Sequence, residues 1–398
     1  MPLNTNHQDC HPLLPRGTHD ERARQEFVKS LHERASGLSR AEASWIYRGR
    51  VVPEFQARYG RAPATRAEAR GAMERDPFWQ TVVGLRRTAQ ELLWSSVIDT
   101  VEREGPALIS SAREYADGPG SLRLSPGLPM PDYLTAVDFH AMPGSYHSES
   151  ATDDVCAGAI FERGTFLYTH GYIGPMSENL GRGMVDFVRR KHPDWQPRRI
   201  LDMGCGIGSC TLPWVDAFPA AEIHGIDVAA PGLRYGHARA NALGKAVQFS
   251  QQNAERTDFP DGHFDLVVSH ILLHETSREA IVNIFRESFR LLAPGGRMVH
   301  ADLPDIRQLP DLFQQVSIDQ DHYDNNEPLW AGYYDLDLMA LLQAAGFPSE
   351  TIAMESAGML LSLPPSSASP ERNRTVTSRF GYGVTSAQKA TPGLSTAP

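Results

Sequence analysis

Three glycines at alternate positions within residues 198–210 constrain the fold of this chain more than any other stretch. An apolar pair leads into Asp202, and glycine then occupies positions 204, 206 and 208. Glycine lets the backbone turn sharply and lets a ligand lie against bare main chain. The following residues, 209–218, can form a helix whose N-terminal amides face that ligand. The stretch therefore predicts a strand, a ligand-binding loop and a helix.

The spacing of these glycines differs from the dinucleotide fingerprint Gly-x-Gly-x-x-Gly. Counted from Gly204, the third glycine of that fingerprint would fall on Ser209. Residues 221–228 read as a second strand that ends in Asp227, about 20 residues after the loop, where an acid can bind ribose hydroxyls. Residues 247–255 read as a third strand that ends in a polar cluster.

Two further segments complete a recognisable series. Residues 259–269 read Phe-Pro-Asp-Gly-His-Phe-Asp-Leu-Val-Val-Ser, and residues 291–297 read Leu-Leu-Ala-Pro-Gly-Gly-Arg. With the glycine loop and Asp227, they resemble the motifs of class I S-adenosylmethionine-dependent methyltransferases in correct order and spacing. The branch that they most resemble is typified by ubiquinone/menaquinone-biosynthesis and sterol methyltransferases. The resemblance covers about residues 170–362, roughly half of the chain.

Strands and helices alternate through this region, which predicts an α/β fold with a doubly wound, mostly parallel sheet. The resemblance implies a seven-stranded Rossmann-like methyltransferase sheet whose last strand is antiparallel. The expected strands are residues 198–204, 221–228, 247–253, 264–273, 297–303, and two closing strands near 351–356 and 359–363.

The chain divides into five predicted segments. They are a disordered N-terminus (1–19), a mostly α-helical N-terminal domain (20–116), a Gly/Pro-rich connector (117–157), a class I methyltransferase domain (158–363) and a disordered tail (364–398). Within the helical domain, Gly105-Pro106 is expected to break the longest helix. The connector is rich in aromatic and histidine side chains for a solvated linker, so we expect it to pack over the catalytic domain; they are Tyr133, Phe139, His140, Tyr146 and His147.

Ligands of open α/β sheets bind at the carboxyl ends of the strands. The resemblance implies S-adenosyl-L-methionine as cofactor, with Asp202 near its amino group, Asp227 on the ribose and Val228 over the adenine. At position 253 the family more often has Asp; Asn253 can both donate and accept a hydrogen bond there. The predicted cofactor-binding residues are Asp202, Gly204, Cys205, Gly206, Gly208, Asp227, Val228, Asn253, Ala254, Glu255, Ser269 and Tyr172.

Methyl transfer requires alignment of donor and acceptor, exclusion of water and, for some acceptors, a base. His270 follows the fourth strand of the sheet, and His274 and Asp302 lie near the same edge; these three are the candidate catalytic residues. For His270, the role of base and a position that only lines the cofactor remain open, and for His274 loop packing is the competing interpretation. Aromatic residues of the insertion at 304–334 suggest either a substrate lid or packing against the helical domain.

We expect no metal site in this chain. His270 and His274 are four apart, but the first closes a strand rather than sharing a helix face with the second. His7, Cys10, His11 and His19 lie in the segment predicted to be disordered. Cys205 and Cys210 flank the glycine loop without a Cys-x-x-Cys pattern, so small-residue packing is preferred over a redox pair.

The net charge of −10 argues against wholesale nucleic-acid binding. No membrane span and no secretory signal are expected, which favours a cytoplasmic protein. The expected partner is a small-molecule acceptor, and a homodimer is left open. The preferred function is methyl transfer to a hydroxyl or carboxyl oxygen. The alternatives are methylation of a protein or another macromolecule, a non-catalytic cofactor-binding regulator, and a nicotinamide-dependent oxidoreductase, against which Ser209 argues.

Overall fold

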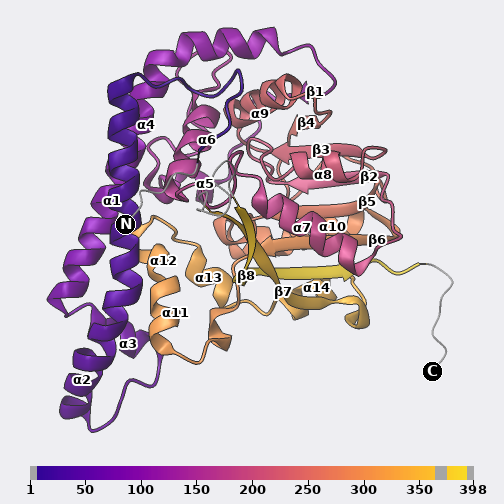
Figure 1. Ribbon diagram of the computed structural model, residues 1–398. Coiled ribbons are helices and arrows are strands. Elements are labelled where there is room, and N and C mark those ends of the chain that lie inside the picture. Colours follow the sequence, from indigo (N-terminus) through magenta and orange to yellow (C-terminus); the bar gives the residue numbers. More distant parts are fainter. Residues whose placement is uncertain (1–6, 364–373, 392–398) are drawn as a thin grey trace, which may run out of the picture.

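The computed structural model describes residues 7–363 and 374–391. Figure 1 shows long helices on one side of the molecule and a sheet with its covering helices on the other. The N-terminal helices are α1 (His19–Ile46), the short π-helix η1 (Tyr47–Val51), α2 (Val52–Tyr59), α3 (Arg66–Met73) and α4 (Pro77–Glu114). Thr18 caps α1 in a capping box with Glu21, and Asp76 caps α4, so both long helices begin at residues that satisfy their first amides.

Helix α4 continues through Gly105-Pro106, so the predicted break at this pair is wrong. Val101 and Leu108, on either side of the pair, are both buried in one hydrophobic core. Proline costs a helix about 3 kcal/mol in its interior. Burial of the flanking side chains therefore outweighs the local preference of the pair.

An eight-stranded sheet forms the other half of the described chain, in the order β1-β4-β3-β2-β5-β6-β8-β7. Strands β1 to β6 pair in parallel, and β8 runs antiparallel to both β6 and β7. The predicted doubly wound α/β fold is confirmed, but the strand count of seven is wrong because the connector adds β1 at the edge. The strands are β1 (Ser121–Arg123), β2 (Arg199–Met203), β3 (Glu222–Asp227), β4 (Gln248–Gln251), β5 (Phe264–His270), β6 (Leu292–Asp302), β7 (Ala353–Leu363) and β8 (Arg374–Gln388).

The two closing strands differ from their predicted positions. Strand β7 spans both predicted segments, with an irregularity between Gly358 and Leu360. Strand β8 lies inside the tail that was predicted to be disordered from residue 364. Its pairing with β6 and β7 depends on residues far away in sequence, which a local reading of a Ser/Thr/Pro-rich tail does not include. The rest of the predicted tail, residues 364–373 and 392–398, lies outside the described residues.

Two hydrophobic cores cover the two faces of the sheet. Successive residues of β2 point to opposite faces, so Ile200 belongs to one core and Leu201 to the other. The first core is closed by α7 (Asn179–Lys191), α8 (Leu212–Ala217) and α9 (Ala230–Ala242). The second is closed by α10 (Arg278–Leu291), α13 (Trp330–Tyr334) and α14 (Leu338–Ala345).

The helical half shares its cores with later parts of the chain. Leu93, Trp94 and Val97 of α4 pack with Phe166 of α6 (Cys156–Tyr168) and Tyr235 of α9. A second shared core joins α1, η1, α3 and α4 to α11 (Leu312–Ile318), which belongs to the insertion at 304–334. The helical segment is thus fastened to the sheet half along much of its length, as Figure 1 shows for α4, α6 and α9.

Residues 7–18 also pack onto the body of the protein, contrary to the predicted disorder. Leu13 is fully buried, and Nε2 of buried His11 lies 3.1 Å from the Glu162 carboxylate. A short segment with few apolar residues gave no local sign of this contact, because its partner is about 150 residues away. Residues 1–6 lie outside the described part of the chain.

The insertion at 304–334 consists largely of short helices. It contains the 3₁₀ turn η4 (Ile306–Gln308), α11, α12 (Gln320–Asp324) and α13, and the 3₁₀ turn η5 (Ser349–Thr351) follows α14. Buried Arg70 of α3 donates to Gln320 at 3.0 Å, and Arg86 of α4 pairs with Asp321. The insertion therefore packs against the helical half, which was one of its two predicted roles. Trp330, at its far end, also reaches the cavity described below.

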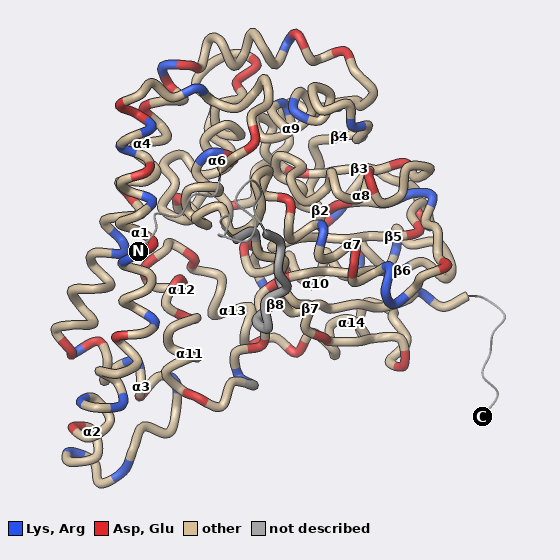
Figure 2. Tube along the Cα trace, viewed as in Figure 1, with Lys and Arg blue, Asp and Glu red and all other residues tan. Residues whose placement is uncertain are grey.

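Figure 2 shows acidic and basic residues interspersed along both halves of the molecule. Charges of the two signs are therefore mixed rather than separated between the helical half and the sheet half. Among the described residues, no helix combines the length and apolar character that a bilayer crossing requires.

Candidate active site

The glycine loop follows β2 as predicted, and its three glycines adopt positive φ angles of 68°, 53° and 78°. A Cβ atom at Gly204 would lie 2.6 Å from the Leu272 side chain, so only glycine fits there. At Gly206 a Cβ atom would meet nothing within 4 Å. The main chain at Gly206 therefore borders open space, as a loop that binds a ligand through its backbone must.

Asp227, at the end of β3, holds this loop in place. One carboxylate oxygen accepts a hydrogen bond from the Gly206 amide and the other accepts one from the Ala229 amide, both at 2.9 Å. Burial raises the pKa of Asp227, while these amides act in the opposite direction. The residue predicted to bind ribose thus also ties the glycine loop to the segment that follows β3.

A cavity of about 430 Å³ opens at the carboxyl ends of β2, β3 and β5. Most of its lining is apolar or aromatic, as is usual for a small-molecule site. Ten of the sequence-predicted residues line it: Asp202, Gly204, Cys205, Gly206, Asp227, Val228, Asn253, Ala254, His270 and His274.

Five predicted residues do not line the cavity. Gly208 follows the part of the glycine loop that lines the cavity. Its amide donates to the Cys205 carbonyl at 2.8 Å, and the chain then continues toward α8. Glu255 accepts a hydrogen bond from Asn283 of α10 at 2.9 Å. Glu255 also accepts the hydroxyl of Tyr133, a residue that lines the cavity, at 3.4 Å.

Tyr172 and Ser269 point to other parts of the structure. The left-handed turn at His170 and Gly171 directs the chain toward α1, where the Tyr172 hydroxyl donates to Glu33 at 2.8 Å. The Ser269 hydroxyl lies 2.6 Å from Nδ1 of His300, and both side chains are fully buried. Burial lowers the pKa of His300 to about 3, so this pair is a neutral contact inside the sheet.

Asp302 is the fifth predicted residue that does not line the cavity, and it contacts His274, which does. Its carboxylate lies 2.6 Å from Nδ1 of His274 and also accepts the Leu273 amide at 2.7 Å. Burial opposes a charge on His274, but Asp302 outweighs it and raises the pKa of His274 to about 9. Protonated near neutral pH, His274 is suited to stabilise negative charge rather than to accept a proton.

His270 is held in a second carboxylate–histidine pair. Its Nδ1 lies 3.1 Å from Oδ1 of Asp202, whose other oxygen accepts the Thr211 hydroxyl at 2.6 Å. The opposite nitrogen, Nε2, is buried and has no hydrogen-bond partner among the described residues. A carboxylate on one ring nitrogen fixes the tautomer and leaves the other nitrogen available to a substrate.

Sequence reasoning assigned no role to several residues that line the cavity. The connector supplies Tyr133, Leu134, His140 and Tyr146, as its unusual aromatic content suggested. The 3₁₀ turn η3 (Leu273–Glu275) supplies Glu275, whose carboxylate accepts the Tyr146 hydroxyl at 2.9 Å. Further aromatic residues come from remote helices, without a local sequence signal: Trp94, Phe161 and Tyr168. Trp330 belongs to the insertion at 304–334, whose aromatic residues suggested a substrate lid.

Part of this chain is similar to known proteins. A family model described as a methyltransferase domain matches residues 200–296. A demethylmenaquinone methyltransferase from Thermus thermophilus is 37% identical over 123 residues, which cover 31% of this chain and 53% of that protein. Phosphoethanolamine N-methyltransferase 1 from Arabidopsis thaliana is 29% identical over 128 residues, covering 32% and 25% respectively.

These matches span about half, or less, of the length of the curated relatives. Among solved structures, an O-methyltransferase family protein from Burkholderia thailandensis superposes with a TM-score of 0.40 and 17% identity, covering 60% of each chain. The family match begins at β2 and ends at the Pro-Gly-Gly turn, so it contains the glycine loop, Asp227 and the two cavity histidines His270 and His274.

Proposed function

Residues 200–296 are a class I S-adenosylmethionine-dependent methyltransferase domain, and from this premise we propose that the protein methylates a small organic acceptor at a hydroxyl or carboxyl oxygen. The observation that carries the proposal is the cavity at the glycine loop, with Asp227 at one side and His270 at the other.

The residues present fit the cofactor. Open space borders the Gly206 backbone, and Asp227 and Val228 line the cavity at the end of β3, where ribose and adenine would bind. Asn253 and Ala254 line it at the neighbouring strand. Bound S-adenosylmethionine would supply a methyl group already activated by its sulfonium.

The chain's own contribution is then to orient the acceptor, exclude water and remove a proton. We assign the proton to Nε2 of His270, because Asp202 fixes the other nitrogen and nothing else in the described structure hydrogen-bonds to Nε2. Asp202 also stabilises the imidazolium that forms. His274, already protonated, would stabilise the acceptor oxygen as its charge develops.

The lining supports a small, largely apolar or aromatic acceptor. Tyr133 and Tyr146 of the connector and Trp330 of α13 surround the cavity from outside the matched domain. The names of the relatives include a phosphoethanolamine N-methyltransferase and a fatty-acid O-methyltransferase, so both nitrogen and oxygen acceptors occur among them. The base assigned to His270 is what favours oxygen here, since a hydroxyl must lose its proton on methylation.

Replacing His270 with asparagine tests this assignment. The asparagine amide can still donate to Asp202, but no group remains to accept the proton, so we expect kcat to fall by roughly 10²- to 10⁴-fold. The measurement is transfer of labelled methyl from S-adenosylmethionine to a panel of phenols, carboxylic acids and amines. Cofactor affinity, measured by calorimetry, should remain close to that of the wild type.

His147→Asn serves as the matched control, because His147 lies in the connector but does not line the cavity. Its rate should match the wild type. Equal rates for His270→Asn and the wild type would exclude His270 as the base. Methylation of amines alone would contradict the oxygen acceptor while leaving the cofactor site intact.

A further inference from the structure

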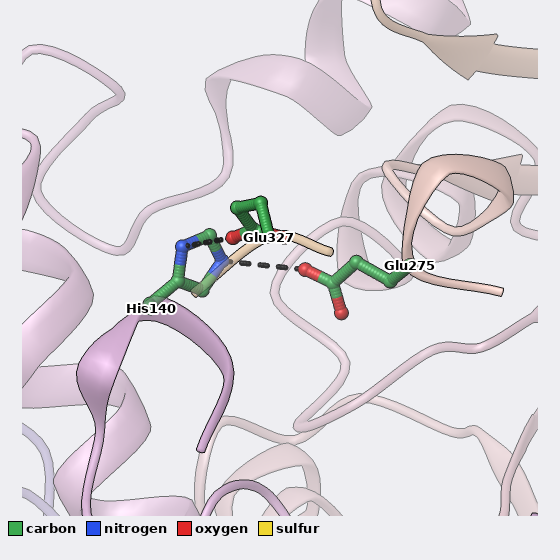
Figure 3. Close-up of side chains that lie close together, drawn as sticks. All are labelled: His140, Glu275 and Glu327. Carbon is green, nitrogen blue, oxygen red and sulfur yellow. Dashed lines mark ion pairs between the residues drawn. The ribbon is translucent and has the colours of Figure 1, made fainter. Parts of the chain in front are cut away.

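Three ionisable side chains from separate segments meet at one end of the cavity. Figure 3 shows His140 of the 3₁₀ turn η2 (Phe139–Ala141) between Glu275 and Glu327, the latter from the loop that joins α12 to α13. Nδ1 of His140 lies 2.7 Å from Glu327, and Nε2 lies 3.2 Å from Glu275. One nitrogen or oxygen atom from each residue lies within 4.8 Å of the other two.

Glu327 has surroundings that do not explain its position. Its side chain is fully buried, and neither carboxylate oxygen accepts a hydrogen bond from the described residues. Its ion-pair partner among the described residues is His140, whose Nδ1 lies 2.7 Å from Oε1. A buried carboxylate without hydrogen bonds is costly, so such a group usually has a cationic ligand or changes its protonation.

We propose that His140, Glu275 and Glu327 bind one divalent transition-metal ion, with the remaining coordination positions open to the cavity. One imidazole and two carboxylates are a ligand set used for manganese, iron and zinc. His140 and Glu275 both line the cavity, so an ion between them would face a bound acceptor. This site departs from the sequence-based expectation that the chain has no metal site.

Binding of an ion requires a change in the orientation of the His140 imidazole. Metal–ligand bonds of about 2.1 Å place adjacent ligand atoms roughly 3 Å apart. The two carboxylates contact different nitrogens of His140. The imidazole must therefore rotate until one nitrogen faces an ion that both carboxylates also bind. His140 has a left-handed backbone, with φ of 55°, and this fixes the direction in which its side chain leaves the chain.

The charges around the cluster also favour a divalent cation. A protonated His140 would balance only one of the two carboxylates. A further cation, His274, is 3.9 Å from Glu275 but is paired at 2.6 Å with Asp302. A divalent ion would balance both glutamates.

Manganese binding tests the site without any methyl transfer, so its outcome is independent of the proposed function. We would titrate the full chain with Mn²⁺ and follow free Mn²⁺ by electron paramagnetic resonance. We expect saturable binding of one Mn²⁺ per chain. Mn²⁺ prefers oxygen and nitrogen ligands, which limits interference from the cysteines.

Two variants locate the ion. Glu327→Gln keeps the side-chain shape, and His140→Asn suits a left-handed backbone because asparagine tolerates it. Each should weaken Mn²⁺ binding at least tenfold, whereas His147→Asn, in the same connector, should bind as the wild type does. Circular dichroism establishes that each variant is folded.

The proposal is overturned if the wild-type protein shows no saturable Mn²⁺ binding, a result that needs no variant. It is equally overturned if folded Glu327→Gln and His140→Asn both bind Mn²⁺ as tightly as the wild type. The ion would then lie elsewhere, and the three side chains would form an ion-pair cluster only.

Discussion

Replacement of Asp227 with alanine is expected to weaken S-adenosylmethionine binding by about 1–3 kcal/mol, or roughly 5- to 150-fold. The proposed ribose contact would be lost. The Gly206 and Ala229 amides would also lose the carboxylate that each now contacts at 2.9 Å, so the loop would be less well ordered. Isothermal titration calorimetry of both proteins with S-adenosylmethionine measures the difference.

Asp216→Ala is the matched control for this experiment. Asp216 is an exposed residue of α8 that pairs with Lys245, and it does not line the cavity. Its affinity should stay within about twofold of the wild type. Unchanged binding by a folded Asp227→Ala protein would remove Asp227 from the cofactor site.

Replacement of Glu162 with glutamine is expected to destabilise the protein by about 3–5 kcal/mol. Glu162 of α6 accepts the Tyr235 hydroxyl at 2.7 Å and Nε of Arg239 at 2.9 Å, and it contacts His11. Arg239 is fully buried, so the variant would leave its charge without a carboxylate. Urea unfolding, followed by circular dichroism, gives the change in free energy.

The pH dependence of this effect has a definite sign. Burial alone would raise the pKa of Glu162, but Arg239, His11 and Tyr235 outweigh it and lower the pKa to about 2. A carboxyl group with a lowered pKa stabilises the fold at pH values above its ordinary pKa of 4.5. This stabilisation is lost as the pH falls toward 2. The free energy of unfolding of the wild type should therefore fall by about 3 kcal/mol over this pH interval, and the variant should not show this fall.

The exposed Glu149 provides the comparison. It pairs with Arg234 at the surface, and Glu149→Gln should cost less than about 1 kcal/mol. If Glu162→Gln were no more destabilising than Glu149→Gln, the buried network would not be what fastens the N-terminal segment and α6 to α9.

The sheet and the cofactor end of the cavity could be predicted because their signals are local. Alternating glycines, an acid at a strand end and a Pro-Gly-Gly turn each specify a backbone conformation within a few residues. Asp202, Gly206, Asp227 and His270 consequently lie where the sequence placed them, around one cavity.

The remaining differences come from contacts between distant residues. Tyr172 was assigned to the cofactor by its position before β2, but the turn at His170 and Gly171 sends it to α1. Strand β8 forms only because β6 and β7 offer it two edges. Glu327 and His140 are nearly 190 residues apart in the sequence, so no local pattern predicted their contact.

Titration of the wild-type protein with S-adenosylmethionine, S-adenosylhomocysteine and NAD tests the central claim most directly. We predict that the first two bind at one site per chain with micromolar affinity and that NAD does not compete with them. Absence of binding by both, or preferential binding of NAD, would contradict the assignment of the glycine loop and of the cavity built around it.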